Sequence, residues 1–242
     1  MNKFFVRQKL SIDDITHLSD VDSEYAINTL RINIGDVVEI ETYEAMYLGI
    51  ITDIQKKSVE VEIREEVKKK GIKDSVDITV AQSLISRNKF HFFLQKATEI
   101  GIDRVIPVES QYSTIKRHKA VKEYGSWKKI IEDATEQSRT TNPLIIEKPV
   151  KLEDLNTNNI SNRVCLCTEN TEYISLQKYL KTINIKEPFL IAIGPEKGWS
   201  SKDINLFKSL DFTFVKLQGN ILRTESVGLV VGSIIKYVKG EI

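Results

Sequence analysis

The stretch 188-PFLIAIGPEKGWSSKDINLFKSLDFTFVKLQGNILRTESVGLVVGSIIKY-237 decides the fold, because strand-like and helix-like pieces alternate along it. The apolar run 188–194 predicts a strand, and a capping-box pattern at Ser200 and Asp203 predicts a helix over 200–210. The aromatic and β-branched run 212–218 predicts a second strand, and the apolar residues after Thr224 recur at helical spacing. Strands that alternate with helices predict an α/β fold, a mostly parallel sheet with helices on both faces.

The same alternation extends back to about residue 76. We expect further strands at 76–85, 104–110 and 163–170, and further helices at 87–101, 125–139 and 172–181. The first part of the chain has another character, with short alternating runs at 35–42, 46–55 and 58–67 that predict a small antiparallel barrel or sandwich. The charged segment 68-KKKGIKDS-75 separates the two patterns, so we predict a domain boundary near residue 72.

The bulk composition excludes several classes of protein. The 242 residues carry a formal net charge of +1, so nucleic acid would be bound through local basic patches. No apolar run is long enough to span a membrane and the start lacks the pattern of a signal peptide, which predicts a cytoplasmic protein. With two cysteines, Cys165 and Cys167, and three histidines, neither a disulfide nor a metal site is expected.

Ligands of open α/β sheets bind beyond the carboxyl ends of the strands, so the loops at these ends are candidate sites. In 191-IAIGPEKGWSSKD-203, Gly194 permits a close approach of the backbone to a ligand, and Pro195 makes the loop rigid. Neither GxGxxG nor the Walker pattern is present. The local sequence leaves open whether this is a ligand loop or an ordinary strand-to-helix turn.

A cation, a hydroxyl and a carboxylate stand together at the start of the last helix, at Arg223, Thr224 and Glu225. The helix dipole alone explains Glu225. Arg223 gains nothing from the dipole at that end, so an anionic ligand or a transition-state charge is a candidate partner. Gly228 and Gly232 lie four residues apart and indicate close packing, either within the chain or in a dimer.

Basic residues cluster in 116-KRHKAVKEYGSWKK-129, together with Tyr124 and Trp127. This mixture is typical of surfaces that bind an RNA backbone and stack a base. A solvated helix face with a core Trp explains it as well. Arg139, near the end of a predicted helix, is explained by the helix dipole as readily as by a ligand.

Four motifs occur in order along the chain: 96-KATEIG-101, 134-ATEQSRTTNP-143, 192-AIGPEKGWS-200 and 219-GNILRTES-226. Together with 29-TLRINIGD-36, they make essentially the whole chain resemble the ribosomal RNA small subunit methyltransferase E family of the SPOUT class. The resemblance implies a PUA-like β-barrel over 1–72 that helps to bind RNA. It also implies a SPOUT methyltransferase domain over 73–242, whose C-terminal segment forms a deep trefoil knot.

The resemblance further implies a homodimer that uses S-adenosylmethionine, without a metal, to methylate ring nitrogen N-3 of a uridine in 16S ribosomal RNA. Arg223 would stabilise the charge that the base develops, and Glu225 would act as a base or orient Arg223. The positions matched to cofactor binding are Thr168, Ile193, Gly194, Pro195, Glu196, Gly198, Leu217, Gly219, Ile221, Leu222 and Thr224. The expected RNA contacts are Arg31, Lys116, Arg117 and Arg139.

The chain departs from the family pattern at several positions. Lys197 stands where Gly is usual, which would be strained if that residue has a positive φ, and Gln218 replaces a common Gly. Ala26 and Gln111 stand where His and Arg are common, at expected RNA contacts. Three alternatives stay open: a SPOUT methyltransferase with another RNA target, a non-catalytic RNA-binding or ribosome-assembly protein, and an unrelated α/β nucleotide-binding enzyme.

Overall fold

The computed structural model describes residues 1–242 except 43, 70–76, 139, 141 and 168–172. The chain forms two compact units. The first comprises Met1–Lys73 with Arg139–Asn142, and the second comprises Asp74–Ser138 with Pro143–Ile242.

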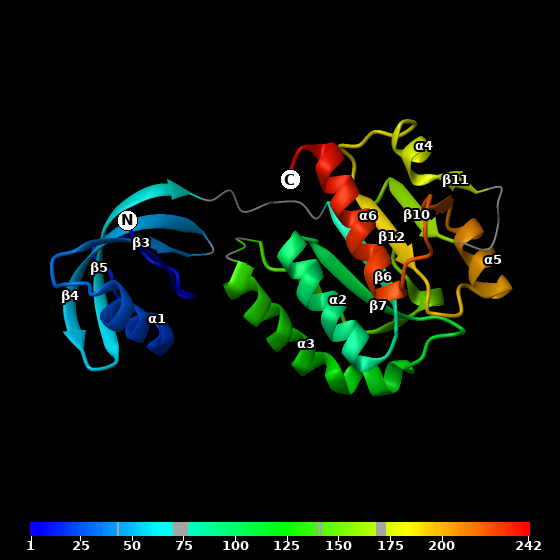
Figure 1. Ribbon diagram of the computed structural model, residues 1–242. Helices are drawn as coiled ribbons and strands as arrows, with labels where there is room; N and C mark the ends of the chain where they lie inside the picture. The colour runs from blue at the N-terminus through cyan, green and yellow to red at the C-terminus, as the bar shows by residue number, and fades with distance from the viewer. Residues whose placement is uncertain (43, 70–76, 139, 141, 168–172) are drawn as a thin grey trace. The chain divides into compact units, whose positions relative to one another are not determined.

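The first unit is built on a five-stranded sheet in the order β1-β3-β4-β5-β2, which curls around its core (Figure 1). β1 runs parallel to β3, and the other pairs are antiparallel. Alternate residues of β5, Val59, Val61 and Ile63, are buried, as the period of the sequence predicts. The edge strands β1 and β2 are not paired with each other among the described residues, so the sheet is open rather than a closed barrel. The bounds are Lys3–Phe5 for β1, Ile15–His17 for β2, Val37–Glu41 for β3, Ala45–Gln55 for β4, Ser58–Lys69 for β5, Asp20–Tyr25 for α1 and Ala26–Leu30 for the π-helix η1.

The second unit contains an eight-stranded sheet in the order β11-β13-β10-β12-β6-β7-β8, with β9 also paired to β7. All of its pairs are parallel, which confirms the predicted α/β fold with a parallel sheet. The strand bounds are Ile78–Ser83 for β6, Arg104–Glu109 for β7, Ile145–Ile146 for β8, Val150–Lys151 for β9, Asn162–Leu166 for β10, Ile174–Ser175 for β11, Phe189–Ile193 for β12 and Thr213–Lys216 for β13.

Both faces of this sheet are covered by helices (Figure 1). Alternate residues of β10 face two different cores: Val164 packs with α2, α3 and α6, whereas Cys165 packs with Phe207 of α5. The helix bounds are Arg87–Ile100 for α2, Arg117–Ser138 for α3, Leu176–Leu180 for α4, Ser201–Ser209 for α5, Thr224–Lys239 for α6 and Leu152–Asp154 for the 3-10 helix η2. A sheet buried on both faces explains why its strands read as continuous apolar runs.

The helix α3 begins at Arg117, well before the predicted start at 125. The Glu109 carboxylate accepts a hydrogen bond from the Arg117 N–H over 2.7 Å and so satisfies a backbone donor of the first turn. Ala120 is buried in the same row as Trp127 and Ile131, so the apolar face extends into the basic segment. The predicted capping box of α5 and the predicted Gly101 stop of α2 are both confirmed.

The two glycines of α6 pack within the chain. A Cβ at Gly232 would lie 2.3 Å from Ile102 Cδ1, and one at Gly228 would lie 3.0 Å from Phe93 Cε2. The glycines therefore let α6 lie close to α2 and the sheet. Of the two possibilities that the sequence left open for this helix face, close packing within the chain is the observed one.

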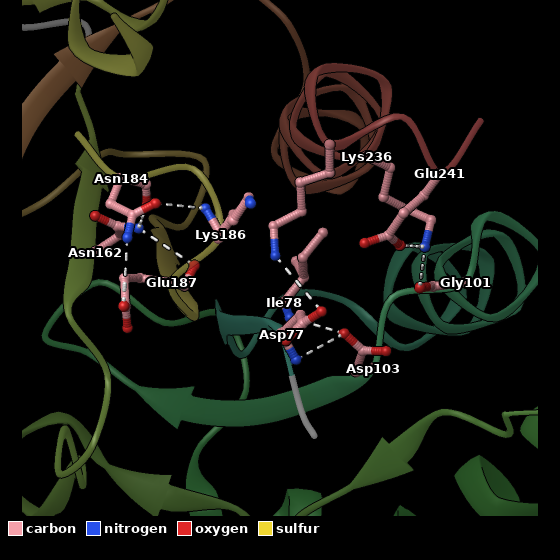
Figure 2. A network of polar contacts seen from close by, with 11 residues as sticks. Asp77, Ile78, Gly101, Asp103, Asn162, Asn184, Lys186, Glu187, Lys236 and Glu241 are labelled. Carbon is pink, nitrogen blue, oxygen red and sulfur yellow. Dashed lines mark hydrogen bonds and ion pairs between the residues drawn. The ribbon is translucent and has the colours of Figure 1, made fainter. Parts of the chain in front are cut away.

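At the amino ends of the strands, a polar network fixes the end of α6 (Figure 2). Lys236 Nζ donates to the Gly101 carbonyl over 3.2 Å and to Glu241 over 2.7 Å. Asp103 accepts from the backbone N–H groups of Asp77 and Ile78 at 3.0 and 2.8 Å. These contacts connect α6, the end of α2 and the start of β6. They lie at the opposite edge of the sheet from the carboxyl ends of the strands.

Within the described ranges, no helix has the length and hydropathy needed to cross a lipid bilayer. Cys165 and Cys167 are both buried thiols, with Sγ atoms 3.7 Å apart.

Replacing Gly232 by Ala should destabilise the second unit. The new methyl group would displace the side chain of Ile102, which is fully buried, and overpacking of this kind typically costs about 1–3 kcal/mol. The better helix propensity of Ala returns about 1 kcal/mol of this. The matched control is Gly125→Ala, where a Cβ meets no atom within 4 Å and the free energy of unfolding should rise. Urea unfolding of both variants measures the two effects, and equal changes of the same sign would contradict the packing assignment.

The pH dependence of stability should include a contribution from His91. Burial, with a smaller effect of the Arg87 cation, lowers the pKa of this imidazole below its ordinary value. Its Nε2 atom lies 4.0 Å from Glu123 on α3, too far for a hydrogen bond. The unfolded chain then binds the proton more readily, so the free energy of unfolding should fall as pH decreases below about 6.5. The denaturant midpoint of His91→Gln should change less between pH 5 and pH 8 than that of the parent protein. A variant of the exposed His118 serves as the control and should keep the pH dependence of the parent protein.

Candidate active site

The carboxyl ends of β13, β10 and β12, which are neighbours in the sheet, border a cavity of about 550 Å³. Its walls come from Leu166 and Cys167 after β10, from 193–199 after β12, and from residues between 217 and 227 that lead from β13 into α6. Lys89 of α2 completes the described lining. The cavity lies where open α/β sheets bind their ligands.

The loop after β12 turns tightly at Pro195–Gly198. The Gly198 N–H donates to the Pro195 carbonyl over 2.9 Å, so Glu196 and Lys197 occupy the tip of the turn. Gly198 has φ +70, whereas Lys197 is not among the residues with a positive φ. Lys197 therefore causes no left-handed strain, and this departure from the family pattern leaves the geometry of the turn intact.

Trp199 joins two walls of the cavity. Its Nε1 donates to the Leu166 carbonyl over 3.0 Å. The indole lies so close to Gly194 that a Cβ there would be 3.2 Å from Cε2. Gly194 is thus required by the close approach of the ring, and the loop after β12 is held against the end of β10.

A buried relay of hydrogen bonds joins three segments at the start of α6. Gln82 Nε2, at the end of β6, donates to Thr224 Oγ1 over 3.2 Å, and Thr224 Oγ1 donates to the Gly194 carbonyl over 2.5 Å. Gln82 is fully buried, and its Oε1 has no donor among the described residues. The relay fixes the first turn of α6 relative to the loop after β12.

Arg223 is the N-cap of α6, with an extended backbone at φ −68 and ψ 148. Its side chain is exposed at the cavity, and no described residue forms a hydrogen bond or an ion pair with it. The guanidinium is therefore available to a ligand.

Glu225 lies in the first turn of α6, only 8% exposed, and lines the same cavity. Its Oε2 is buried without a hydrogen-bond partner among the described residues. A buried carboxylate oxygen without a donor is costly, although the helix N-terminus favours its charge. No ion pair joins it to Arg223 within the described chain. The cavity thus contains one acceptor without a donor, Glu225 Oε2, and one cationic donor without a partner, Arg223. Thr224 separates these two residues in the chain.

The structure gathers the predicted positions around this one cavity. Ten of the eleven expected cofactor positions line it, as do Arg223 and Glu225. Thr168 lies outside the described residues. Four further residues at the site were not predicted from the sequence: Gln82, Lys89, Cys167 and Trp199. Lys89 and Gln82 come from distant parts of the chain, so no local pattern marks them, whereas Trp199 inside the Gly-Pro loop was a signal that could have been used.

None of the expected RNA contacts that the structure describes is part of the cavity lining. Arg31 follows the π-helix η1 in the first unit, with a left-handed φ of 51, and its side chain is exposed. In the second unit, Lys116 lies 3.5 Å from Glu109, and exposed Arg117 begins α3. Arg139 lies outside the described residues. Trp127 is a core residue and the Tyr124 hydroxyl donates to the Ile146 carbonyl, so the structural explanation holds for these two aromatic side chains.

A family model described as an RNA methyltransferase domain matches residues 73–236, more than half of the chain. Two curated relatives are named ribosomal RNA small subunit methyltransferase E. The one from Rickettsia conorii is 26% identical over 231 residues, covering 94% of this chain and 92% of its own length. The one from Aquifex aeolicus is 29% identical over 197 residues, covering 78% and 80%. A solved structure of a protein of this name from Neisseria gonorrhoeae, bound to S-adenosyl methionine, has a TM-score of 0.73 at 23% identity over 98% of both chains.

Removing the hydroxyl group of the relay should loosen the cavity. Thr224→Val leaves Gln82 Nε2 and the Gly194 carbonyl without their partner, which typically costs about 1–3 kcal/mol of stability. Thr224→Ser keeps the hydroxyl and should retain most of the stability. Chemical denaturation of both variants compares the two effects. Equal losses would indicate that the methyl group of Thr224, rather than the relay, is the stabilising element.

Proposed function

This chain belongs to the RNA methyltransferase domain family, as its motifs predict, and we propose that it methylates ring nitrogen N-3 of a uridine in 16S ribosomal RNA with S-adenosylmethionine as methyl donor. The proposal rests on one observation above all. The same cavity contains a carboxylate oxygen without a hydrogen-bond donor and a guanidinium without an acceptor among the described residues. The names of the curated relatives support small-subunit ribosomal RNA as the substrate.

The cavity fits the proposed cofactor in size and chemistry. Its volume of about 550 Å³ lies within the range typical of small-molecule sites, roughly 300–1,000 Å³. Apolar side chains at Leu166, Ile193 and Leu217 suit a nucleoside, and the close-packed backbone at Gly194 offers polar groups without side-chain obstruction. We assign cofactor binding to the positions that the resemblance implies: Thr168, Ile193, Gly194, Pro195, Glu196, Gly198, Leu217, Gly219, Ile221, Leu222 and Thr224. When bound, the cofactor supplies a sulfonium methyl group.

The base that reacts must present an N–H donor next to a carbonyl acceptor. Glu225 Oε2 would accept the N-3 proton, and Arg223 would stabilise the negative charge that spreads onto the flanking oxygens. Since no described ion pair joins the two side chains, the role of Glu225 as a base is favoured over the role of orienting Arg223. The N-3 edge of uracil lies on the base-pairing face, so the base must be unpaired or splayed out to enter the cavity.

A methyltransferase with another RNA target is the second candidate. The N-1 edge of guanine also places an N–H beside a carbonyl, so the same donor and acceptor would fit it. The non-catalytic alternative was motivated by Lys197 and Gln111, and the unstrained backbone at Lys197 removes the first of these two motives.

We extend the proposal to the architecture that the family resemblance implies. The curled sheet of the first unit supports a PUA-like RNA-binding domain over 1–72, with Arg31 as an RNA contact. We assign 73–242 to a SPOUT domain with a trefoil knot, and Lys116, Arg117 and Arg139 to further RNA contacts. The loops after β12 and β13 share one cavity and are tied by Thr224, which supports a knotted C-terminal segment. Ribosomal RNA as a substrate places the proposed enzyme in the cytoplasm.

Replacing Arg223 by Ala should lower kcat for methylation by about 100-fold or more, the typical effect of losing one donor that stabilises developing charge. The affinity for S-adenosylmethionine should stay nearly unchanged, because the guanidinium is assigned to the base. Methyl transfer to 16S ribosomal RNA and calorimetric titration with the cofactor measure the two quantities. A parallel fall of both would make Arg223 a binding or folding residue instead.

The protein should be a homodimer that uses the outer face of α6. Val230, Tyr237 and Val238 are 38%, 73% and 46% exposed and lie on the same side of that helix, opposite its packed glycines. Light scattering at micromolar concentration should give the mass of a dimer. Val230→Lys should shift the population towards monomer, whereas a purely monomeric parent protein would contradict the assignment.

A further inference from the structure

Three cations from three separate segments line the cavity. Lys89 comes from the first turn of α2, Lys197 from the turn after β12, and Arg223 from the N-cap of α6. The acidic side chains of the lining do not balance them. Glu225 is buried, and Glu196 forms an ion pair with Lys89. The described lining therefore holds three cationic and two anionic side chains, and Lys197 and Arg223 are the cations without a described partner.

Glu196 contacts Lys89 and directly precedes Lys197 in the chain. Glu196 and Lys197 are the two central residues of the Pro195–Gly198 turn, and the Glu196 carboxylate contacts Lys89 Nζ. The side chain of Lys197 is exposed and has no partner among the described residues. The turn thus displays one unpaired cation and holds a second one through a carboxylate.

We propose that Lys89 and Lys197 bind a phosphodiester group of the RNA adjacent to the nucleotide that enters the cavity. In the free protein, Glu196 pairs with Lys89, and a phosphate displaces Glu196 when RNA binds. The proposal rests on the proposed function, because it takes the substrate to be RNA.

The exposure of the ion pair makes this exchange feasible. The Lys89 and Glu196 side chains are 29% and 46% exposed, and ion pairs of such exposure are weak. A phosphodiester is a stronger competitor for a lysine than a solvated carboxylate, because its binding also releases the counterions of the RNA. A nucleotide splayed into the cavity brings its own backbone close to the solvent-accessible residues of the lining, which include both lysines.

The test measures RNA affinity as a function of salt for four variants, without cofactor. Lys89→Gln and Lys197→Gln should each reduce the slope of log K against log salt by about 0.7–0.9, the contribution of one phosphate contact. Glu196→Gln should raise RNA affinity, because it removes the competing carboxylate. Lys197→Arg should keep the slope of the parent protein. The matched control is Lys186→Gln, an exposed lysine at the amino ends of the strands, which should change nothing. The probe is 16S ribosomal RNA.

Two results would overturn the proposal. Slopes that stay unchanged in Lys89→Gln and Lys197→Gln would show that neither lysine contacts a phosphate. A fall in calorimetric affinity for S-adenosylmethionine in these variants, with RNA binding unchanged, would assign the lysines to the carboxylate of the cofactor. Failure of the parent protein to bind the cofactor would instead defeat the proposed function, so the two failures are distinguishable.

Discussion

The site depends on the hydrogen bond from the Thr224 hydroxyl to the Gly194 carbonyl, supported from behind by Gln82. It joins the loop after β12 to the first turn of α6. Because the relay is buried, water cannot replace the partner that a group loses when one of these hydrogen bonds breaks. Arg223 and Glu225 flank Thr224 in the chain, so the same contact positions both of them.

The rest of the second unit allows this contact to form. The two glycines of α6 bring the helix down onto α2 and the sheet, and Lys236 fixes its far end at the Gly101 carbonyl. The packing of α6 is therefore specified along its length, and its first turn lies at the carboxyl ends of the strands. A rigid helix that presents a cation and a carboxylate at one end suits a reaction governed by position and charge.

Much of this could be predicted from the sequence, because the alternation of apolar runs with helical patterns marks a parallel sheet wherever it occurs. The capping box of α5 and the stop at Gly101 are local signals and were confirmed. The early start of α3 at Arg117 was missed, since its basic residues hide the buried Ala120. Gln82 and Lys89 reach the cavity from segments more than a hundred residues away in sequence, and no periodicity reports such contacts. The knot, the dimer and the chemistry of the site residues stay predictions.

We propose that the Glu225 carboxylate and the Arg223 guanidinium act together on the N-3 edge of uracil, and the product of the reaction distinguishes this base from guanine. The most direct measurement is to incubate the protein with S-adenosylmethionine and small ribosomal subunits that lack this modification, digest the RNA, and identify the methylated nucleoside by mass spectrometry. The expected product is 3-methyluridine, at a single position of the 16S RNA. Methylation at guanine N-1 or at a ribose hydroxyl, with no 3-methyluridine, would contradict it.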